Sequence, residues 1–105
     1  MTDEQLVQAF YECRSQALDE LAERYHRILA SVVYLALLAR GSSSVQVENE
    51  WDIDERVQNV WAEVFNGKFG HGQHWDDSKG SVLSWLFCLT VREVDRHLRY
   101  RHGIP

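Results

Sequence analysis

Apolar side chains along this chain recur three and four residues apart, the spacing that places them on one face of an α-helix. No segment alternates apolar and polar residues in the manner of a half-buried strand. The pattern predicts helices over residues 1–14, 15–41, 52–66 and 81–101. We therefore expect an all-α fold, a compact bundle of about three to four helices.

Residues that favour helix ends lie at the boundaries of these segments. Thr2 with Gln5 and Asp52 with Glu55 are each three residues apart, as in a capping box. Gly41 follows the longest apolar pattern and is expected to end that helix in a left-handed conformation. The first three helices therefore have recognisable boundaries.

The segment before the last helix has a different composition. Residues 67–80 are rich in glycine, histidine and aspartate, which predicts a long loop. Either Ser78 or Ser81 is expected to cap the helix that follows. Along that helix, 100° per residue predicts a core stripe of Phe87, Val91, Val94 and Leu98.

Length and composition suit one globular domain over residues 1–105. Cys13 and Cys88 have no metal-type spacing, so we expect reduced thiols packed in the core. The apolar run from Ile28 to Ala39 is too short to cross a membrane. We therefore expect a soluble, cytoplasmic protein that contacts no membrane.

Charge is distributed unevenly around the net value of −5. Residues 1–81 carry seven Lys and Arg against fourteen Asp and Glu, whereas residues 82–105 carry four Arg against two acidic residues. An acidic body with one basic helix suggests two different partners.

The basic residues of the last helix gather with one aromatic residue in a sector of roughly 60°. This column consists of Trp85, Arg92, Arg96 and Arg99. Arginine pairs with phosphate and tryptophan stacks on exposed bases, so the column is a candidate nucleic-acid surface. The alternative is that the arginines only solvate a surface while Trp85 packs in the core.

Three stretches, in order, resemble region 2 of the extracytoplasmic-function group of the sigma-70 family. Residues 53–61 resemble its Ala-Glu-Asp-Leu-Val-Gln-Glu-Val-Phe motif, and residues 75–87 resemble its Phe-Asp-Pro-x-Arg-Gly-Ser-Phe-x-x-Trp-Leu-Phe motif. Leu18, Leu21 and Tyr25 resemble the family's Phe-x-x-Leu-Tyr-x-x-Tyr opening. The resemblance makes residues 15–41, 52–66, 67–80 and 81–101 similar to region 2.1, region 2.2, the specificity loop and region 2.3/2.4.

The resemblance implies a polymerase-binding face on the helix of residues 52–66. In this family that face binds the clamp-helix coiled coil of the RNA polymerase β′ subunit. The corresponding residues here are Asp54, Glu55, Gln58 and Asn59. An acidic face suits an arginine-rich partner, because opposite charges steer docking. The alternative is an ordinary solvated helix face.

The resemblance also implies a loop that captures a base flipped out of the minus-ten promoter element. Its candidates are Phe69, His71, His74, Trp75 and Asp76, with Lys79 beside them as a DNA contact. Stacking surfaces and polar groups suit such a pocket. Trp75 has an alternative role as a core anchor for the loop. The histidines lack the spacing of a closed metal site, and no metal or cofactor is expected.

Two functions follow as expectations. The first is a sigma region 2-like domain that binds β′ and melts the minus-ten element, contacting its non-template strand. The second is a sigma-like interaction module that binds an anti-sigma factor without touching promoter DNA. No pairing of nucleophile and base appears, so we do not expect an enzyme. The chain shows no helix-turn-helix region 4, so we expect either a fragment or a stand-alone domain.

Overall fold

The computed structural model describes residues 1–41, 53–67 and 74–101. Its helices are α1 (Asp3–Tyr11), α2 (Ser15–Ala39), α4 (Ile53–Gly67) and α5 (Val82–Arg101), with the short 3-10 helix η1 (Asp77–Lys79) before α5. Within those three ranges there is no strand. The prediction of an all-helical bundle is confirmed.

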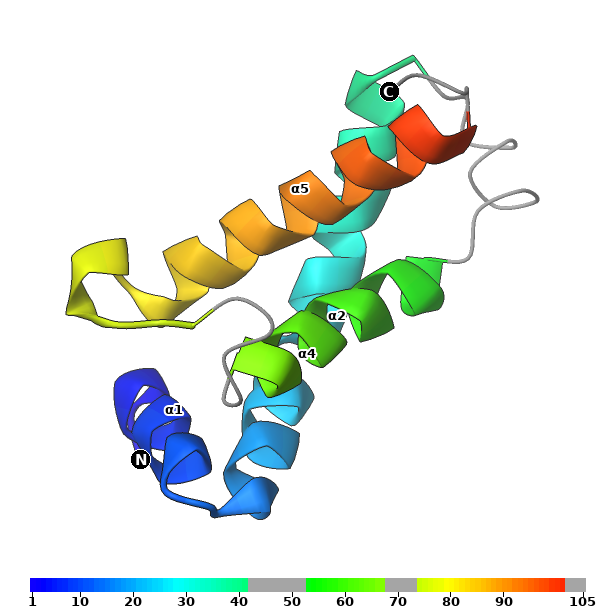
Figure 1. The fold of residues 1–105 in the computed structure, drawn as a ribbon. Coiled ribbons are helices and arrows are strands. Elements are labelled where there is room, and N and C mark those ends of the chain that lie inside the picture. Colours follow the sequence, from blue (N-terminus) through cyan, green and yellow to red (C-terminus); the bar gives the residue numbers. More distant parts are fainter. Residues whose placement is uncertain (42–52, 68–73, 102–105) are drawn as a thin grey trace.

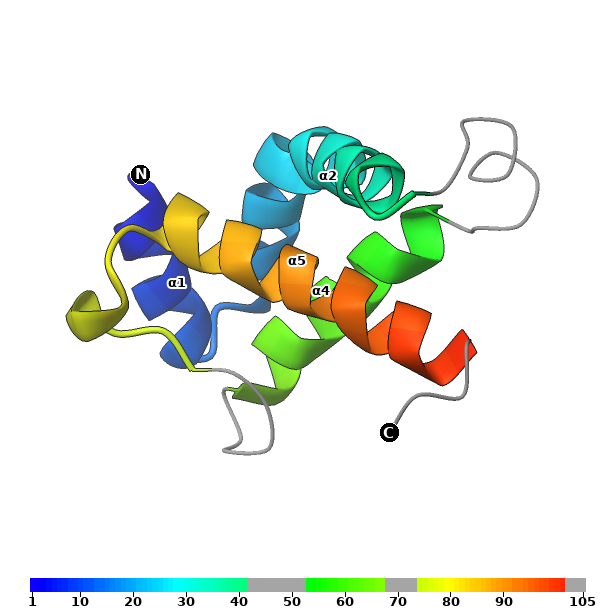
Figure 2. The same ribbon diagram turned by 90° about the horizontal axis from the view of Figure 1, so that it is seen from above.

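Helix α2 is the element on which the others assemble. It contacts α1, α4 and α5, and α4 also packs on α5. Figure 1 shows α1 beside the first half of α2, with α4 and α5 running in opposite directions. Seen from above in Figure 2, α4 and α5 cross one another. The buried core takes apolar side chains from all four of these helices.

The predicted capping box at Thr2 and the predicted end of the second helix at Gly41 are confirmed. The Thr2 hydroxyl accepts from the Gln5 backbone N–H at 3.1 Å, and the Gln5 side chain accepts from the Thr2 N–H at 2.8 Å. Gly41 follows α2 with a φ of +92°, and its N–H donates to the Leu38 carbonyl. These bonds satisfy backbone groups that a helix end leaves without partners.

The cap of α5 is Ser81, one of the two serines predicted. Its hydroxyl accepts from the Ser84 backbone N–H at 3.1 Å. Ser78 belongs to η1 instead, where its N–H donates to the Asp76 carboxylate at 2.9 Å. The predicted capping box at Asp52 lies outside the described residues.

The prediction that both cysteines pack in the core is wrong. Cys13 and Cys88 are free and exposed. Cys13 follows α1 with a φ of +76°, a left-handed conformation. Its N–H donates to the Phe10 carbonyl and the Arg14 N–H donates to the Ala9 carbonyl, the bond pattern of a Schellman motif. Such a residue ends the helix at the surface, which explains why the Cys13 thiol is accessible.

The predicted core stripe of α5 is also partly wrong. Phe87 is 51% exposed, although Val94 is fully buried. The buried face consists of Val82, Trp85, Leu86, Leu89, Thr90, Glu93 and Val94. Apolar residues surround more than half of this helix, so periodicity alone does not determine which flank its neighbours cover.

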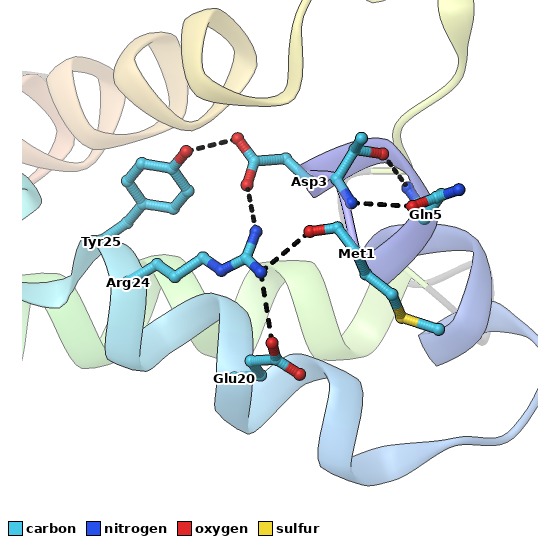
Figure 3. Close-up of polar contacts among 7 residues, drawn as sticks. Met1, Asp3, Gln5, Glu20, Arg24 and Tyr25 are labelled. Atoms are coloured by element: carbon cyan, nitrogen blue, oxygen red, sulfur yellow. Dashed lines mark hydrogen bonds and ion pairs between the residues drawn. The ribbon is translucent and has the colours of Figure 1, made fainter.

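A cluster of polar side chains fastens α1 to α2 (Figure 3). The Arg24 guanidinium contacts Asp3 at 3.1 Å, Glu20 at 3.2 Å and the Met1 carbonyl at 2.9 Å. The Tyr25 hydroxyl donates to the second oxygen of Asp3, and this bond raises the pKa of Tyr25. We call Asp3, Glu20, Arg24 and Tyr25 the N-terminal cluster.

Among the helices of the described residues, none combines the length and the apolar character that crossing a membrane requires.

Candidate functional site

The candidate protein-binding face lies on α4. This helix buries Val57, Val60 and Val64 against the core, and its opposite side faces solvent. Asp54 and Glu55 are exposed in the first turn. Gln58, one turn further on, is exposed as well. Three of the four residues predicted for this face therefore lie at the surface.

Each of the two exposed acids has a basic side chain nearby. The Asp54 carboxylate lies 3.3 Å from the His26 Nε2 atom of α2. The Glu55 carboxylate contacts the Arg56 guanidinium at 3.1 Å. Both carboxylates nevertheless remain largely open to solvent, with side-chain exposures of 78% and 58%. A cationic partner can therefore reach both carboxylates.

Asn59, the fourth predicted residue, is directed elsewhere. Its side-chain amide donates to the Glu93 carboxylate of α5 at 3.0 Å. Asn59 is only partly accessible. Asn59 therefore joins α4 to α5. The sequence placed it on the outer face of α4, whereas the structure directs its side chain towards α5.

Glu93 is the centre of a polar network between the two helices. It is 4% exposed and accepts from Arg56 at 3.3 Å, from Asn59 and from Arg96. We call this network the α4–α5 seam; its members are Arg56, Asn59, Glu63, Glu93, Arg96 and His97. A buried carboxylate needs such partners, because an unpaired charge in the interior is very costly.

The seam also contains a contact between Arg56 and His97. The Arg56 Nη1 atom lies 2.7 Å from the His97 Nδ1 atom. Arginine only donates, so Nδ1 must accept and the ring proton must sit on Nε2. Arg56 is itself buried, and its Nε has no partner among the described residues. An open groove of about 510 Å³ lies here, lined by Arg56 and His97 together with Glu55, Asn59, Glu93 and Arg96.

Arg96 lies at the outer edge of the seam. Its side chain is 62% exposed, yet it is paired twice. Nη1 contacts Glu63 of α4 at 2.9 Å, and Nη2 donates to Glu93. Pairing with Glu93, and then with Glu63, raises the pKa of Arg96 despite partial burial. Its positive charge is therefore largely balanced by two carboxylates.

The other two predicted arginines differ from Arg96. Arg92 and Arg99 are exposed, and neither forms an ion pair with a carboxylate of the described residues. Arg92 lies one turn before Arg96, and Arg99 lies one turn after it. The surface of α5 thus presents Arg92 on one side of the paired Arg96 and Arg99 on the other.

Trp85 does not belong to this surface. It is 5% exposed and packs in the core, so it is not available to stack on a base. The predicted column of one tryptophan and three arginines is corrected to the arginines alone. The structure instead supports the alternative prediction for Trp85, which was packing in the core. Trp85 occupies the same angular sector as the three arginines. It lies near the start of α5, however, and this part of the helix is covered by α1 (Figure 2).

Trp75 is likewise a core residue. It is 2% exposed, its backbone N–H donates to the Tyr11 hydroxyl at 2.8 Å, and its ring N–H donates to the Gly80 carbonyl at 3.0 Å. The bond to Tyr11 anchors the segment before α5 on α1, and the bond to Gly80 closes the segment on itself. The anchor role is the one observed, and Trp75 is removed from the candidates for base capture.

The remaining described residues of this segment lie at the surface. The exposed His74 ring stacks on Tyr11 with centroids 4.2 Å apart. Asp76 caps η1, and its bond from the Ser78 hydroxyl lowers its pKa. Lys79 is exposed at the end of η1. Two further candidates, Phe69 and His71, lie outside the described residues.

The buried charges of the seam were not predicted from the sequence. Arg56 lies three residues after Ile53 and one before Val57, inside the apolar stripe of α4. A charged residue at such a position is a signal for a buried pair. Its partner Glu93 occupies a similar position before Val94. Within the described ranges, no three His, Cys, Asp or Glu side chains are grouped as a metal site would require.

Comparison with known proteins gives no match. No family model, no curated protein and no solved structure matches this chain. The candidate site is therefore defined by its geometry alone. It consists of an acidic face on α4 and a basic edge on α5, which the α4–α5 seam joins.

Proposed function

We propose that this chain is a sigma region 2-like binding module in transcription initiation. Its α4 face would dock on the β′ clamp helices of RNA polymerase, and its α5 arginines would contact the non-template strand of the minus-ten element. The observation that carries the proposal is the exposure of Asp54, Glu55 and Gln58 on α4 beside exposed arginines on α5. The motif order described above supplies the identity of the partners.

The polymerase half of the proposal rests on charge and access. Asp54 and Glu55 lie in the first turn of α4 and keep most of their side-chain surface in solvent. Carboxylates in this setting steer a cationic coiled coil and form charge-assisted bonds with its arginines. The amide of Gln58 adds a hydrogen-bonding group on the same side.

The DNA half of the proposal involves fewer residues than the sequence suggested. Arg92 and Arg99 are available for phosphate oxygens, and Lys79 adds a cation at the end of η1, just before α5. With Trp75 and Trp85 buried, the exposed His74 and Asp76 remain as candidates for base capture, together with Phe69 and His71, which lie outside the described residues. Phosphate contacts provide affinity, whereas base contacts provide sequence preference.

Binding to a β′ clamp-helix fragment tests the polymerase half. Calorimetric titration of the chain with this fragment should yield a complex that Asp54→Arg weakens by about tenfold or more, because a charge is reversed at the contact. Gln58→Ala should weaken it less. Glu12→Arg, at the end of α1, makes the same charge change far from this face and should leave binding nearly unchanged. A complex indifferent to Asp54→Arg rules out this docking face.

Binding to single-stranded oligonucleotides tests the DNA half. An oligonucleotide with a minus-ten sequence should bind more tightly than a scrambled one in the presence of the β′ fragment. Arg92→Glu and Arg99→Glu should weaken both, because they remove phosphate contacts. Equal affinity for the two sequences excludes promoter recognition.

A second candidate function is a sigma-like module that binds an anti-sigma factor and no DNA. One observation favours it: Arg96 is balanced by Glu63 and Glu93, which reduces the free positive charge of α5. The exposed Phe87 and Leu83 add apolar surface one turn apart on the same helix. This function predicts a tight complex with an anti-sigma domain and no oligonucleotide binding under any of the conditions above.

A further inference from the structure

We infer that Arg96 is shared between the two surfaces, and that a cationic partner on α4 releases it for a phosphate by taking over Glu63. The inference rests on the proposed function, whose partner and nucleic acid it connects. In the free chain Glu63 and Glu93 hold the Arg96 guanidinium. Docking of a cation at Glu63 removes one of these two carboxylates.

The geometry makes Arg96 the residue that can move. Its side chain is 62% exposed and lies at the solvent edge of the seam. Arg56, by contrast, is buried and held by Glu55 and Glu93. Arg96 is thus the seam cation that a phosphate can reach without opening the core.

The two carboxylates that hold Arg96 are not equivalent. Glu93 also accepts from Arg56 and Asn59, so it keeps hydrogen bonds when Arg96 leaves. Glu63 is 28% exposed, and Arg96 is the cation it pairs with among the described residues. Glu63 is therefore free to exchange one cation for another, and Glu93 stays satisfied.

The position of Glu63 connects this exchange to the docking face. It lies on α4, eight residues after Glu55 and four after Asn59, so it continues the row of these two residues along the flank of α4 that faces α5. A cationic coiled coil that lies along this row meets Glu55 first and Glu63 at its far end. Arg92 and Arg99 already flank Arg96 on α5, so its release completes a row of three cations.

A charge-matched pair of variants tests the release in the absence of any partner. The probe is a fluorescent oligothymidine, and the readout is its affinity for the full chain as a function of salt. Glu63→Gln should raise affinity about fivefold, the upper range expected for one exposed ion pair. It should also steepen the plot of log K against log salt by about 0.7, as one added phosphate contact does.

Asp54→Asn is the matched control. It also removes one negative charge from α4, but the Asp54 carboxylate contacts His26 rather than Arg96. It should change affinity by less than about twofold, a net-charge effect alone. The double variant Glu63→Gln with Arg96→Gln should lose the gain. An equal gain in the control, or a gain that persists without Arg96, overturns the inference, and so does a Glu63→Gln chain that binds no oligothymidine.

A second measurement separates this inference from the proposed function. The Nε–H signal of Arg96, followed by NMR while the β′ fragment is added, should shift as Glu63 changes partner. If the fragment binds and the Arg96 signal stays unchanged, the inference fails and the docking face stands. If the fragment does not bind, the proposed function fails, and the oligothymidine measurements alone decide whether Glu63 restrains Arg96.

Discussion

The N-terminal cluster and the α4–α5 seam use the same chemistry in different surroundings. Each joins two helices through an arginine between carboxylates, Arg24 in the first case and Arg56 in the second. Arg24 lies near the surface, where its side chain is 35% exposed. Glu93, at the centre of the seam, is almost completely buried.

This difference decides what each group of residues contributes. Ion pairs at the surface add little stability, because water solvates the charges almost as well when they are apart. A buried pair is different, because removing one member leaves the other charged and without solvent. The N-terminal cluster therefore fastens α1 weakly, whereas the seam fixes how the two candidate binding surfaces lie relative to each other.

The strongest test of this contrast is Glu93→Ala. It leaves Arg56 without the buried one of its two carboxylate partners, and we expect the free energy of unfolding to fall by about 3–5 kcal/mol. Urea denaturation measures the change. Asp95→Ala, which removes the partner of Arg40 near the surface on the same helix, is the control and should cost about 1 kcal/mol or less. Equal effects of the two variants contradict the contrast.

The next test is Arg24→Ala in the N-terminal cluster. Loss of its pairs with Asp3 and Glu20 should lower the free energy of unfolding by about 1 kcal/mol. Because screening weakens exposed pairs, the cost should shrink in 1 M salt, where the Debye length is about 3 Å. A cost as large as that of Glu93→Ala, or one insensitive to salt, places the cluster in the same class as the seam.

Cys13→Gly tests how firmly α1 is terminated beside the cluster. Cys13 has a left-handed backbone, which disfavours any residue with a Cβ atom. Glycine should therefore raise the free energy of unfolding by roughly 0.5–1 kcal/mol. Cys88→Gly, in the exposed interior of α5, should lower it by about the same amount. Thermal unfolding of the two variants should move the Tm in opposite directions.

The smallest expected effect is a pH dependence confined to the cluster. The Tyr25 hydroxyl donates to Asp3, which raises its pKa above the ordinary value of 10.0. The folded state therefore favours the protonated phenol, and this contribution is present below pH 10 and is lost as pH rises through the folded pKa. Tyr25→Phe should flatten the stability profile in that alkaline range. An unchanged profile shows that the bond to Asp3 contributes nothing.

Much of the fold was predictable because helix ends have local causes. The caps at Thr2, Gly41 and Ser81 each depend on residues within a few positions, so the sequence contains the necessary information. The exposure of Asp54, Glu55 and Gln58 was predictable for the same reason. A polar side of an amphipathic helix faces solvent unless another element covers it.

The rest depended on which helices meet, and that is not a local property. Trp85 and Arg96 occupy similar angles on α5, yet only the first is buried. Asn59 looked like a surface residue because its partner, Glu93, lies 34 positions away. Phe87 is 51% exposed for the same reason, because the packing of segments distant in sequence decides which side of α5 is covered.

The bond between the Trp75 backbone and the Tyr11 hydroxyl has a consequence for the order of folding. It joins residues 64 positions apart, so it can form only after a large part of the chain has been brought together. Closing such a loop costs entropy before the contact is gained. We therefore expect α2, α4 and α5 to associate first and the segment before α5 to settle on α1 late. Substitutions at Tyr11 should then speed unfolding far more than they slow folding.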